Sequence, residues 1–194
     1  MLRAFLRELR PAVVALAALT LITGILYPLA VTAVAQVAMP GQANGSLVTD
    51  GGRVVGSALI GQAFSDPGHL WGRPSAAGAG AGYDANASSG SNLAPTSHVL
   101  IERVTAELAR QQTVNGPGPV PVELLTASGS GLDPHLSPEA ARYQAPRIAA
   151  ARGLPVDRVL AIIDAHTEAP LLGLLGRPRV NVLAVNLALD GVAP

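Results

Sequence analysis

Ser130, Asp133 and His135 are the residues whose types and spacing come nearest to a catalytic constellation. Acyl transfer requires a hydroxyl nucleophile, an imidazole base and a carboxylate that orients the base, and this short segment contains all three groups. Residues so near one another in sequence rarely converge on one reacting atom. We therefore expect a packed turn here, with an extracytoplasmic hydrolase as the alternative.

The same segment contains a glycine-rich turn, Ser128-Gly129-Ser130-Gly131. Glycines let backbone N–H groups point at an anion, so the turn is a candidate phosphate-binding loop. The favoured interpretation is structural, because glycines also permit a sharp turn between an extended segment and a helix that begins at Ser137.

Other catalytic motifs are missing from the sequence. There is no Gly-x-Ser-x-Gly or His-Glu-x-x-His motif, and the chain has no lysine, which excludes a Walker A loop and a Ser-x-x-Lys nucleophile. The four histidines are widely separated and never occur at the spacing of metal ligands on a helix. We therefore predict no catalytic residue, no metal site and no cofactor of its own. The histidines are His69, His98, His135 and His166.

The elements that position these residues follow an apolar N-terminal segment. Residues 11–49 contain no charged side chain, and residues 12–34 exceed the roughly 20 apolar residues that cross a hydrocarbon core of about 30 Å. This length predicts one membrane span. Pro28 lies inside the span and removes a helical hydrogen bond, so we expect a kink near Tyr27.

The segment before the span is basic, which predicts its orientation. Arginines beside a span are retained in the cytoplasm, and Arg3, Arg7 and Arg10 outnumber Glu8. We predict a protein that crosses the bilayer once, with its larger part in the periplasm or extracellular space. Its expected parts are a cytoplasmic N-terminus over 1–10, a transmembrane helix over 11–38 and an extracytoplasmic, periplasmic domain over 39–194.

A cleaved signal peptide is the alternative to a retained anchor. Arginines precede an apolar stretch, and Ala33-Val34-Ala35 has the small residues of a cleavage site. The apolar region of a signal peptide runs to about 15 residues, and this stretch is longer. Its length favours retention.

The composition of the outer part limits its partners. Three of the 13 arginines and one of the 13 acids precede residue 11, which leaves ten arginines and twelve acids beyond it. This part is slightly acidic, so nucleic acid and anionic lipid surfaces are not expected partners. The chain has no cysteine, and an extracytoplasmic domain would depend on its hydrophobic core rather than on disulfides.

The outer part begins with a short strand and a long loop. Residues 54–60 are an apolar run between glycines, which predicts a strand. Residues 65–95 are dense in Gly, Ala, Ser, Asn and Pro, which predicts an irregular loop. The turn-forming residues around Trp71 indicate specific packing of this loop.

Helices are predicted after the loop. The first is capped by Thr96, and the second begins at Ser137, where a proline follows the cap. Pro146 either kinks the second helix or begins a new turn, which Gly153 ends. The apolar spacing over 156–163 predicts a further amphipathic helix.

Two more apolar runs are predicted to be extended. Residues 120–125 indicate a short strand or extended segment, and residues 179–189 alternate loosely between apolar and polar side chains, which predicts the best strand in the chain, in a central position. The fold class is therefore α+β, with one N-terminal transmembrane helix and one outer domain.

Six short motifs in fixed order after the single span make the chain resemble the KdpC family, the small subunit of the bacterial potassium-transporting P-type ATPase. The resemblance covers essentially the whole chain. The motifs are residues 56–64 (GSALIGQAF), 71–76 (WGRPSA), 89–96 (SGSNLAPT), 126–135 (TASGSGLDPH), 143–152 (YQAPRIAAAR) and 180–186 (VNVLAVN).

The resemblance implies a non-catalytic accessory subunit of an ATP-driven potassium importer in the bacterial inner membrane. Its implied partners are a potassium-translocating subunit and a P-type ATP-hydrolysing subunit. The family is described as a catalytic chaperone that raises the affinity of the hydrolytic subunit for ATP. On that description ATP acts through the complex, and the matching candidates for nucleotide contact are Gln144, Ser128, Gly129, Ser130 and Gly131.

The predicted orientation conflicts with direct nucleotide contact, because it places Gln144 and Ser130 on the side where ATP is scarce. We therefore favour binding to the outer face of the potassium-translocating subunit. Trp71, Arg73 and Asn92 are the candidates for that contact, since an aromatic anchor and an arginine commonly dominate interfaces. A stand-alone membrane-anchored binding module is the remaining alternative.

Overall fold

A computed structural model describes residues 2–80 and 82–191, and its contacts divide the chain into two compact units. The first unit ends at Ser46 and the second begins at Leu47. The first is a long apolar helix with a short terminal turn, and the second combines helices with two small sheets, so the α+β prediction is confirmed.

The first unit contains a helix long and apolar enough to cross a membrane, Arg7–Ala38, with 32 residues and no buried side chain in its apolar window. This stretch is part of a continuous helix made up of α1 (Leu2–Leu21), the π-helical segment η1 (Ile22–Leu26) and α2 (Tyr27–Ala38). The short helix α3 (Pro40–Ala43) follows. The predicted N-terminal apolar helix is therefore present.

A kink is predicted near Tyr27, and the structure has the π-helical segment η1 directly before that residue. Pro28 lacks the N–H that an α-helix needs at that position, so the helical ladder is interrupted there. Thr23 adds to the irregularity, because its hydroxyl donates to the Leu19 carbonyl oxygen at 2.7 Å.

The second unit opens with a two-stranded hairpin. Strands β1 (Leu47–Asp50) and β2 (Arg53–Ser57) pair antiparallel, with Asp50 opposite Arg53. Gly51 and Gly52 form the turn, with φ of 53° and 80°. A two-residue turn whose twist matches that of the paired strands requires a positive φ at both positions. The strand predicted over 54–60 is thus shorter and begins one residue earlier.

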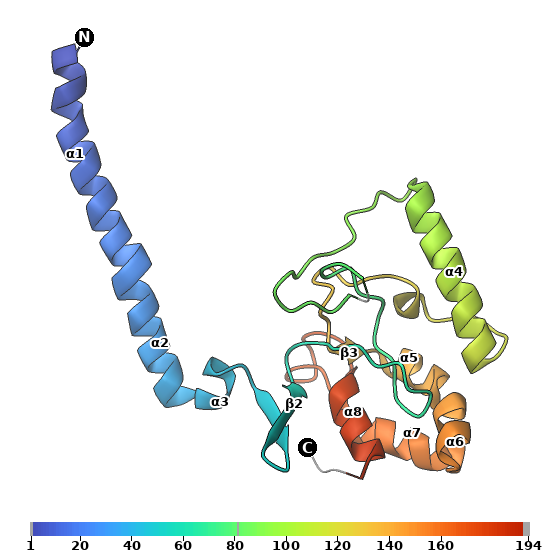
Figure 1. Ribbon diagram of the computed structural model, residues 1–194. Coiled ribbons are helices and arrows are strands. Elements are labelled where there is room, and N and C mark those ends of the chain that lie inside the picture. The colour runs from blue at the N-terminus through green and yellow to red at the C-terminus, as the bar shows by residue number, and fades with distance from the viewer. Residues whose placement is uncertain (1, 81, 192–194) are drawn as a thin grey trace. The chain divides into compact units, whose positions relative to one another are not determined.

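Between β2 and α4 (His98–Asn115), the described residues form a long segment without helix or strand. We call residues 61–96 the long loop. It belongs to the second unit, and Figure 1 shows it as the blue-green to green path between β2 and α4. Leu70, Trp71 and Ala77 in this loop are buried. The predicted specific packing is confirmed.

The rest of the second unit combines a small sheet with four helices. The sheet has the strand order β3-β5-β4, all antiparallel, with β5 in the centre. The helices α5 to α8 gather beside it in Figure 1, where α4 stands to one side of them. The elements are the 3-10 turn η2 (Val122–Leu124), β3 (His135–Leu136), α5 (Pro138–Tyr143), α6 (Ala145–Arg152), α7 (Val156–Ala165), β4 (Thr167–Glu168), β5 (Arg179–Asn181) and α8 (Val182–Leu189).

The core lies between these helices and the sheet. Leu124 and Leu136 are fully or almost fully buried with residues from every helix from α5 to α8. Burial of such side chains contributes about 1.5–3 kcal/mol each. The core side chains of the helices and of β5 include Ala141, Ile148, Val159, Ile163, Val180 and Val185.

The helix boundaries follow the predicted signals in the middle of the domain. The Ser137 hydroxyl accepts a hydrogen bond from Ala140 N as the cap of α5, and Pro146 lies in the first turn of a new helix, α6. Gly153 ends that helix in the left-handed region, with φ 64° and ψ 28°. At α4 the cap position is Ser97 rather than Thr96.

The prediction of a long central strand over 179–189 is wrong beyond Asn181. The central strand β5 ends at Asn181, and its side chain accepts a hydrogen bond from Ala184 N at 3.0 Å, which starts α8. The run from 182 to 189 is apolar on nearly all sides, and a buried helix and a buried strand have the same appearance in such a run. The Asn181 cap makes this run a helix rather than a strand.

The extended segment predicted over 120–125 is also corrected. Residues 122–124 form the 3-10 turn η2, in which Leu124 N donates to the Pro121 carbonyl oxygen at 3.0 Å. The turn places Leu124 in the core and leaves Val122 71% exposed. A strand would place these two side chains, two residues apart, on the same face, and no neighbouring strand is available here among the described residues.

The cap of α8 gives the first testable prediction. Asn181→Ala removes the bond from Ala184 N and a second bond from Asn181 Nδ2 to the Ala58 carbonyl oxygen at 3.0 Å. We expect the free energy of unfolding of the full chain in detergent to fall by about 2 kcal/mol. The matched control is Ser97→Ala, at a cap whose side chain makes no capping bond. An equal loss in both variants would contradict the assignment.

Candidate functional site

Two buried side-chain amides hold the backbone of the long loop. Gln144 Oε1 accepts from Trp71 N at 3.0 Å and its Nε2 donates to the Trp71 carbonyl oxygen at 3.0 Å. Asn186 does the same for Leu70, with Leu70 N to Oδ1 at 2.7 Å and Nδ2 to the Leu70 carbonyl oxygen at 3.0 Å. We call these two side chains with residues 70 and 71 the amide clasp.

The elements that carry the clasp explain its position. Gln144 lies between α5 and α6 and is 0% exposed, while Asn186 lies in the apolar helix α8 and is 2% exposed. Each amide offers one acceptor and one donor to the N–H and C=O of a single residue, as a neighbouring strand would. The clasp therefore satisfies four backbone groups of a segment that has no strand partner.

Arg147 joins the clasp to the indole of Trp71. Its Nη2 donates to Gln144 Oε1 at 2.7 Å, and its guanidinium lies 4.0 Å above the indole centroid. The guanidinium of Arg110 lies 4.8 Å from the same centroid. Burial, and after it the charge of Arg110, lowers the pKa of Arg147 to about 10. Arg147 is therefore still protonated at neutral pH, as the cation–π contact requires.

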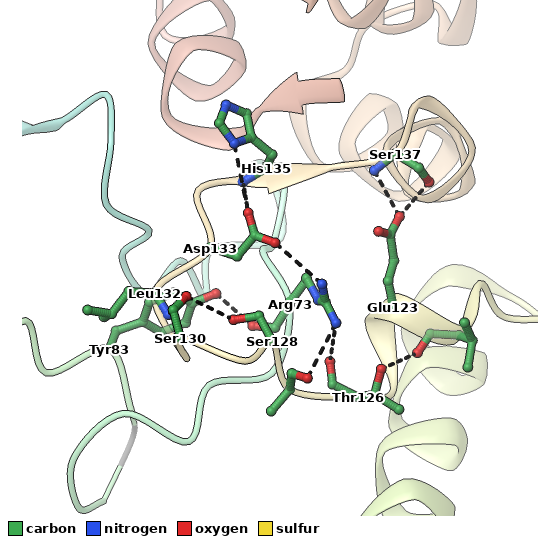
Figure 2. Close-up of polar contacts among 12 residues, drawn as sticks. Arg73, Tyr83, Glu123, Thr126, Ser128, Ser130, Leu132, Asp133, His135 and Ser137 are labelled. Atoms are coloured by element: carbon green, nitrogen blue, oxygen red, sulfur yellow. Dashed lines mark hydrogen bonds and ion pairs between the residues drawn. The ribbon is translucent and has the colours of Figure 1, made fainter. Parts of the chain in front are cut away.

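The three candidates for partner contact have different positions. Trp71 is buried, and its Nε1 donates to the Asp66 carbonyl oxygen at 2.8 Å. Arg73 is half-buried. Its guanidinium donates to Asp133 Oδ2 at 3.3 Å and to the Ala127 carbonyl oxygen at 3.3 Å (Figure 2). Asn92 is exposed in the left-handed region, with φ 50°. Their contact with a partner stays a prediction.

The Ser128–Gly131 turn packs under the long loop. Its Ser128 and Ser130 hydroxyls lie 3.4 Å apart, and Ser130 Oγ accepts from Leu132 N at 3.1 Å (Figure 2). Ser128 is buried, while Gly129 and Ser130 are exposed. The turn and the residue after it accept hydrogen bonds from the loop, namely Ser89 N and Ser88 Oγ to Ser130 O, Ser75 Oγ to Gly131 O, and Gly61 N to Leu132 O.

The geometry of Ser130, Asp133 and His135 does not assemble a nucleophile and a base. Asp133 Oδ1 lies 3.8 Å from His135 Nδ1, but Ser130 Oγ is engaged with Ser128 and Leu132 on the far side of Asp133 (Figure 2). Burial and the charge of Arg179 lower the pKa of His135, although Asp133 and Glu168 oppose this. The lowered pKa of His135 favours its neutral form, and no described hydroxyl donates to the imidazole.

Two of the other three histidines, His69 and His166, make polar contacts within the domain. His69 Nε2 lies 3.0 Å from the carboxylate of Asp190, and His166 Nδ1 lies 2.8 Å from the Ile162 carbonyl oxygen. Over residues 2–80 and 82–191, no group of three or more His, Asp or Glu side chains could hold a metal ion.

Sequence reasoning missed Asn186 and Arg147. Asn186 had a recognisable signal, since it is one polar side chain inside the apolar run of 182–189. A buried amide in such a position needs hydrogen-bond partners. Nothing in the sequence indicates that its partner is the backbone of Leu70, more than a hundred residues away.

Comparisons with known proteins agree with the motifs. The family described as "KdpC: K+-transporting ATPase, c chain" matches residues 9–191. A Myxococcus xanthus relative is 60% identical over 193 residues, which cover 98% of this chain and 89% of the relative. A Caulobacter vibrioides relative is 56% identical over 190 residues (97% and 95%), and one from Rhodospirillum rubrum is 56% identical over 187 residues (95% and 96%). All three are named potassium-transporting ATPase KdpC subunit.

The packing of the glycine-rich turn predicts different effects at its two glycines. Gly131 has φ 67°, and an added Cβ would lie 2.5 Å from Ser89 O and 2.7 Å from Ala77 N. We expect Gly131→Ala to lower the free energy of unfolding by about 2–4 kcal/mol. Gly129→Ala meets nothing within 4 Å and is the control, with an effect within about 0.5 kcal/mol. Equal stability of both variants by denaturant unfolding would contradict this packing.

The ionisation of Tyr83 gives a pH prediction. Its hydroxyl donates to the Arg73 carbonyl oxygen at 2.6 Å, and burial, with the charge of Asp133, raises its pKa to about 12. The unfolded chain loses this proton near pH 10, so the stabilisation is present below pH 10 and is lost as the pH rises toward 12. We expect the stability of the wild type to fall over this interval more steeply than that of Tyr83→Phe. Parallel declines in alkaline unfolding would refute the assignment.

Proposed function

The chain belongs to the KdpC family and is a subunit of the potassium-transporting ATPase, and from this premise we propose that it is a non-catalytic accessory subunit. The proposal rests on what the candidate polar side chains bind. Gln144, Arg73 and Ser130, the candidates for chemistry or ligand contact, each bind other parts of this chain. Their contacts favour a scaffold role.

We propose that the subunit crosses the membrane once with its N-terminus in the cytoplasm. The N-terminal apolar helix supports a membrane anchor, and the excess of arginine over acid before it supports this orientation. Residues 1–10 would then be cytoplasmic, 11–38 would span the bilayer, and 39–194 would form the periplasmic domain.

Its proposed partners are the potassium-translocating subunit and the ATP-hydrolysing subunit of the complex. The orientation puts the second unit on the side opposite the cytoplasmic hydrolytic domain. The outer face of the potassium-translocating subunit is therefore the surface that we propose it binds. In this role the subunit stabilises the assembly that imports potassium.

We propose that any rise in the ATP affinity of the hydrolytic subunit comes through assembly rather than through contact of ATP with Gln144. Both the oxygen and the nitrogen of the Gln144 amide have partners inside the domain, and the side chain is fully buried. A nucleotide could reach this amide only after the amide clasp opened. Opening it leaves buried backbone groups without partners, at about 1–3 kcal/mol each.

Purification of the intact complex tests the accessory role. The full chain with a C-terminal tag is recovered from detergent-solubilised membranes of cells grown at low potassium, and the co-purified proteins are identified by mass spectrometry. We expect a P-type ATPase and a potassium-translocating subunit in stoichiometric amounts, with residues 1–35 still attached to the tagged chain. A solitary chain without its N-terminal segment would contradict both the role and the anchor.

Substitution of Gln144 separates the structural role from nucleotide contact. We expect Gln144→Ala to lower the free energy of unfolding of the isolated chain by about 2–4 kcal/mol without nucleotide, because Trp71 loses two hydrogen-bond partners. The control is the exposed Gln112→Ala. A Gln144→Ala chain as stable as the control, in a complex with a raised KM for ATP, would favour direct contact instead.

A further inference from the structure

Helix α4 is attached to the second unit without the packing that normally holds a helix. Within the described residues, the buried side chains of this 18-residue helix are limited to Gln111. Neither the hydrophobic core nor the apolar side chains packed against it include a described residue of α4. Most helices in proteins are stabilised by packing an apolar face against the core. The attachment of α4 must therefore come from other contacts.

The buried amide of Gln111 is satisfied inside the helix itself. Its Nε2 donates to Glu107 Oε1 at 2.9 Å, and its Oε1 accepts from Asn115 Nδ2 at 2.7 Å. A buried amide ordinarily fixes an element in place, because moving the element would break its hydrogen bonds. Here both partners move with α4. Movement of the helix therefore leaves this amide bonded.

Two polar contacts join α4 to the folded domain. The guanidinium of Arg110 lies 4.8 Å from the indole centroid of Trp71, and Asn115 Oδ1 accepts from Arg147 Nε at 2.9 Å. Both lie toward the C-terminal end of the helix, where Figure 1 shows α4 nearest to α6. The rest of α4 projects away from this point of attachment.

Loss of these two contacts leaves both arginines with partners. Without Asn115, Arg147 keeps its bonds to Gln144 Oε1 at 2.7 Å and to the His69 carbonyl oxygen at 3.0 Å. Arg110 likewise keeps Glu107, whose Oε2 accepts from Arg110 Nε at 2.9 Å. An arginine deprived of every partner would make separation costly. The amide clasp and α4 are therefore independent of each other.

Packing between α4 and the long loop is incomplete. A cleft of about 260 Å³ lies there, lined among others by Trp71 and Arg73 of the loop and by Glu107 and Arg110 of α4. Side chains on opposite walls of a cleft make no dispersion contact across it. Little packing is therefore lost when α4 moves away from the loop.

The chain can change direction at both ends of α4. After the helix, Gly116 and Gly118 have φ of 99° and 151°, and a Cβ added at either would meet nothing within 4 Å. Before the helix, residues 93–96 have neither helix nor strand. A few loop residues of this kind are enough to absorb the dihedral changes of a hinge.

We propose that α4 is a lid over the indole of Trp71, and that it opens while the core and the amide clasp stay folded. In the closed state Trp71 is 8% exposed, with Arg110 over its ring. The bond from Trp71 Nε1 to the Asp66 carbonyl oxygen holds the indole in position when the lid opens. The lid therefore controls access to the aromatic side chain predicted as a partner anchor. This inference concerns the outer domain alone and does not depend on the proposed function.

Distances between spin labels on α4 and α7 test the lid in the full chain in detergent. The chain has no cysteine, so cysteines introduced at the exposed positions Val99 and Arg158 carry the only labels. Double electron–electron resonance should give a predominant short distance in the otherwise unchanged chain. The double variant Arg110→Ala with Asn115→Ala lacks both contacts to the domain. We expect its ratio of long to short distances to rise by a factor of about 30 or more.

The matched control is Glu102→Ala with Thr105→Ala, two exposed substitutions in the same helix that should leave the distances unchanged. Hydrogen exchange in α7 around Ile163 shows whether the core stays folded. A single short distance in the double variant would overturn the inference. A long distance that appears only together with fast exchange at Ile163 would also overturn it, because the whole domain would then be unfolding.

Fluorescence of Trp71 tests which residue the lid covers. It is the only tryptophan of the chain, so quenching by acrylamide reports its accessibility. Asn115→Ala leaves Arg110 in place, and quenching should rise in proportion to the open fraction that the labels give for the same variant. Glu102→Ala is the control and should match the wild type. Quenching that stays at the wild-type level while the labels report an open lid would refute the assignment of Trp71 as the covered residue.

Discussion

Buried backbone groups must be hydrogen-bonded, and this constraint organises the outer domain. Within the described residues, the long loop has neither helix nor strand, yet Leu70 and Trp71 lie in the core. The side-chain amides of Asn186 and Gln144 take the place of a neighbouring strand and satisfy the N–H and C=O groups of both residues. Because α8 and the α5–α6 junction carry these amides, the clasp ties the loop to the C-terminal half of the domain.

Local signals in the sequence predicted local structure well. The apolar length of the first unit, the cap at Ser137 and the stop at Gly153 act over a few residues, and each gives the element expected. The start of α8 could not be predicted, because an all-apolar run fits helix and strand alike. The amide clasp could not be predicted either, since its partners are far apart in sequence and nothing in the residue types pairs them.

The candidate site was predicted as a set of residues rather than as an arrangement. Gln144, Arg73 and the Ser128–Gly131 turn do lie in one region of packing around the long loop, but their contacts hold this domain together. Family membership and this use of polar groups fit an accessory subunit.

Hydrogen exchange at the backbone amides of Leu70 and Trp71 tests the amide clasp most directly. The account predicts that, in the full chain in detergent, both amides exchange as slowly as those in the core of α7 around Ile163, although they lie in a loop. Exchange as fast as that of the exposed loop residues 84–88 would contradict it, because the side-chain amides would then not hold this backbone.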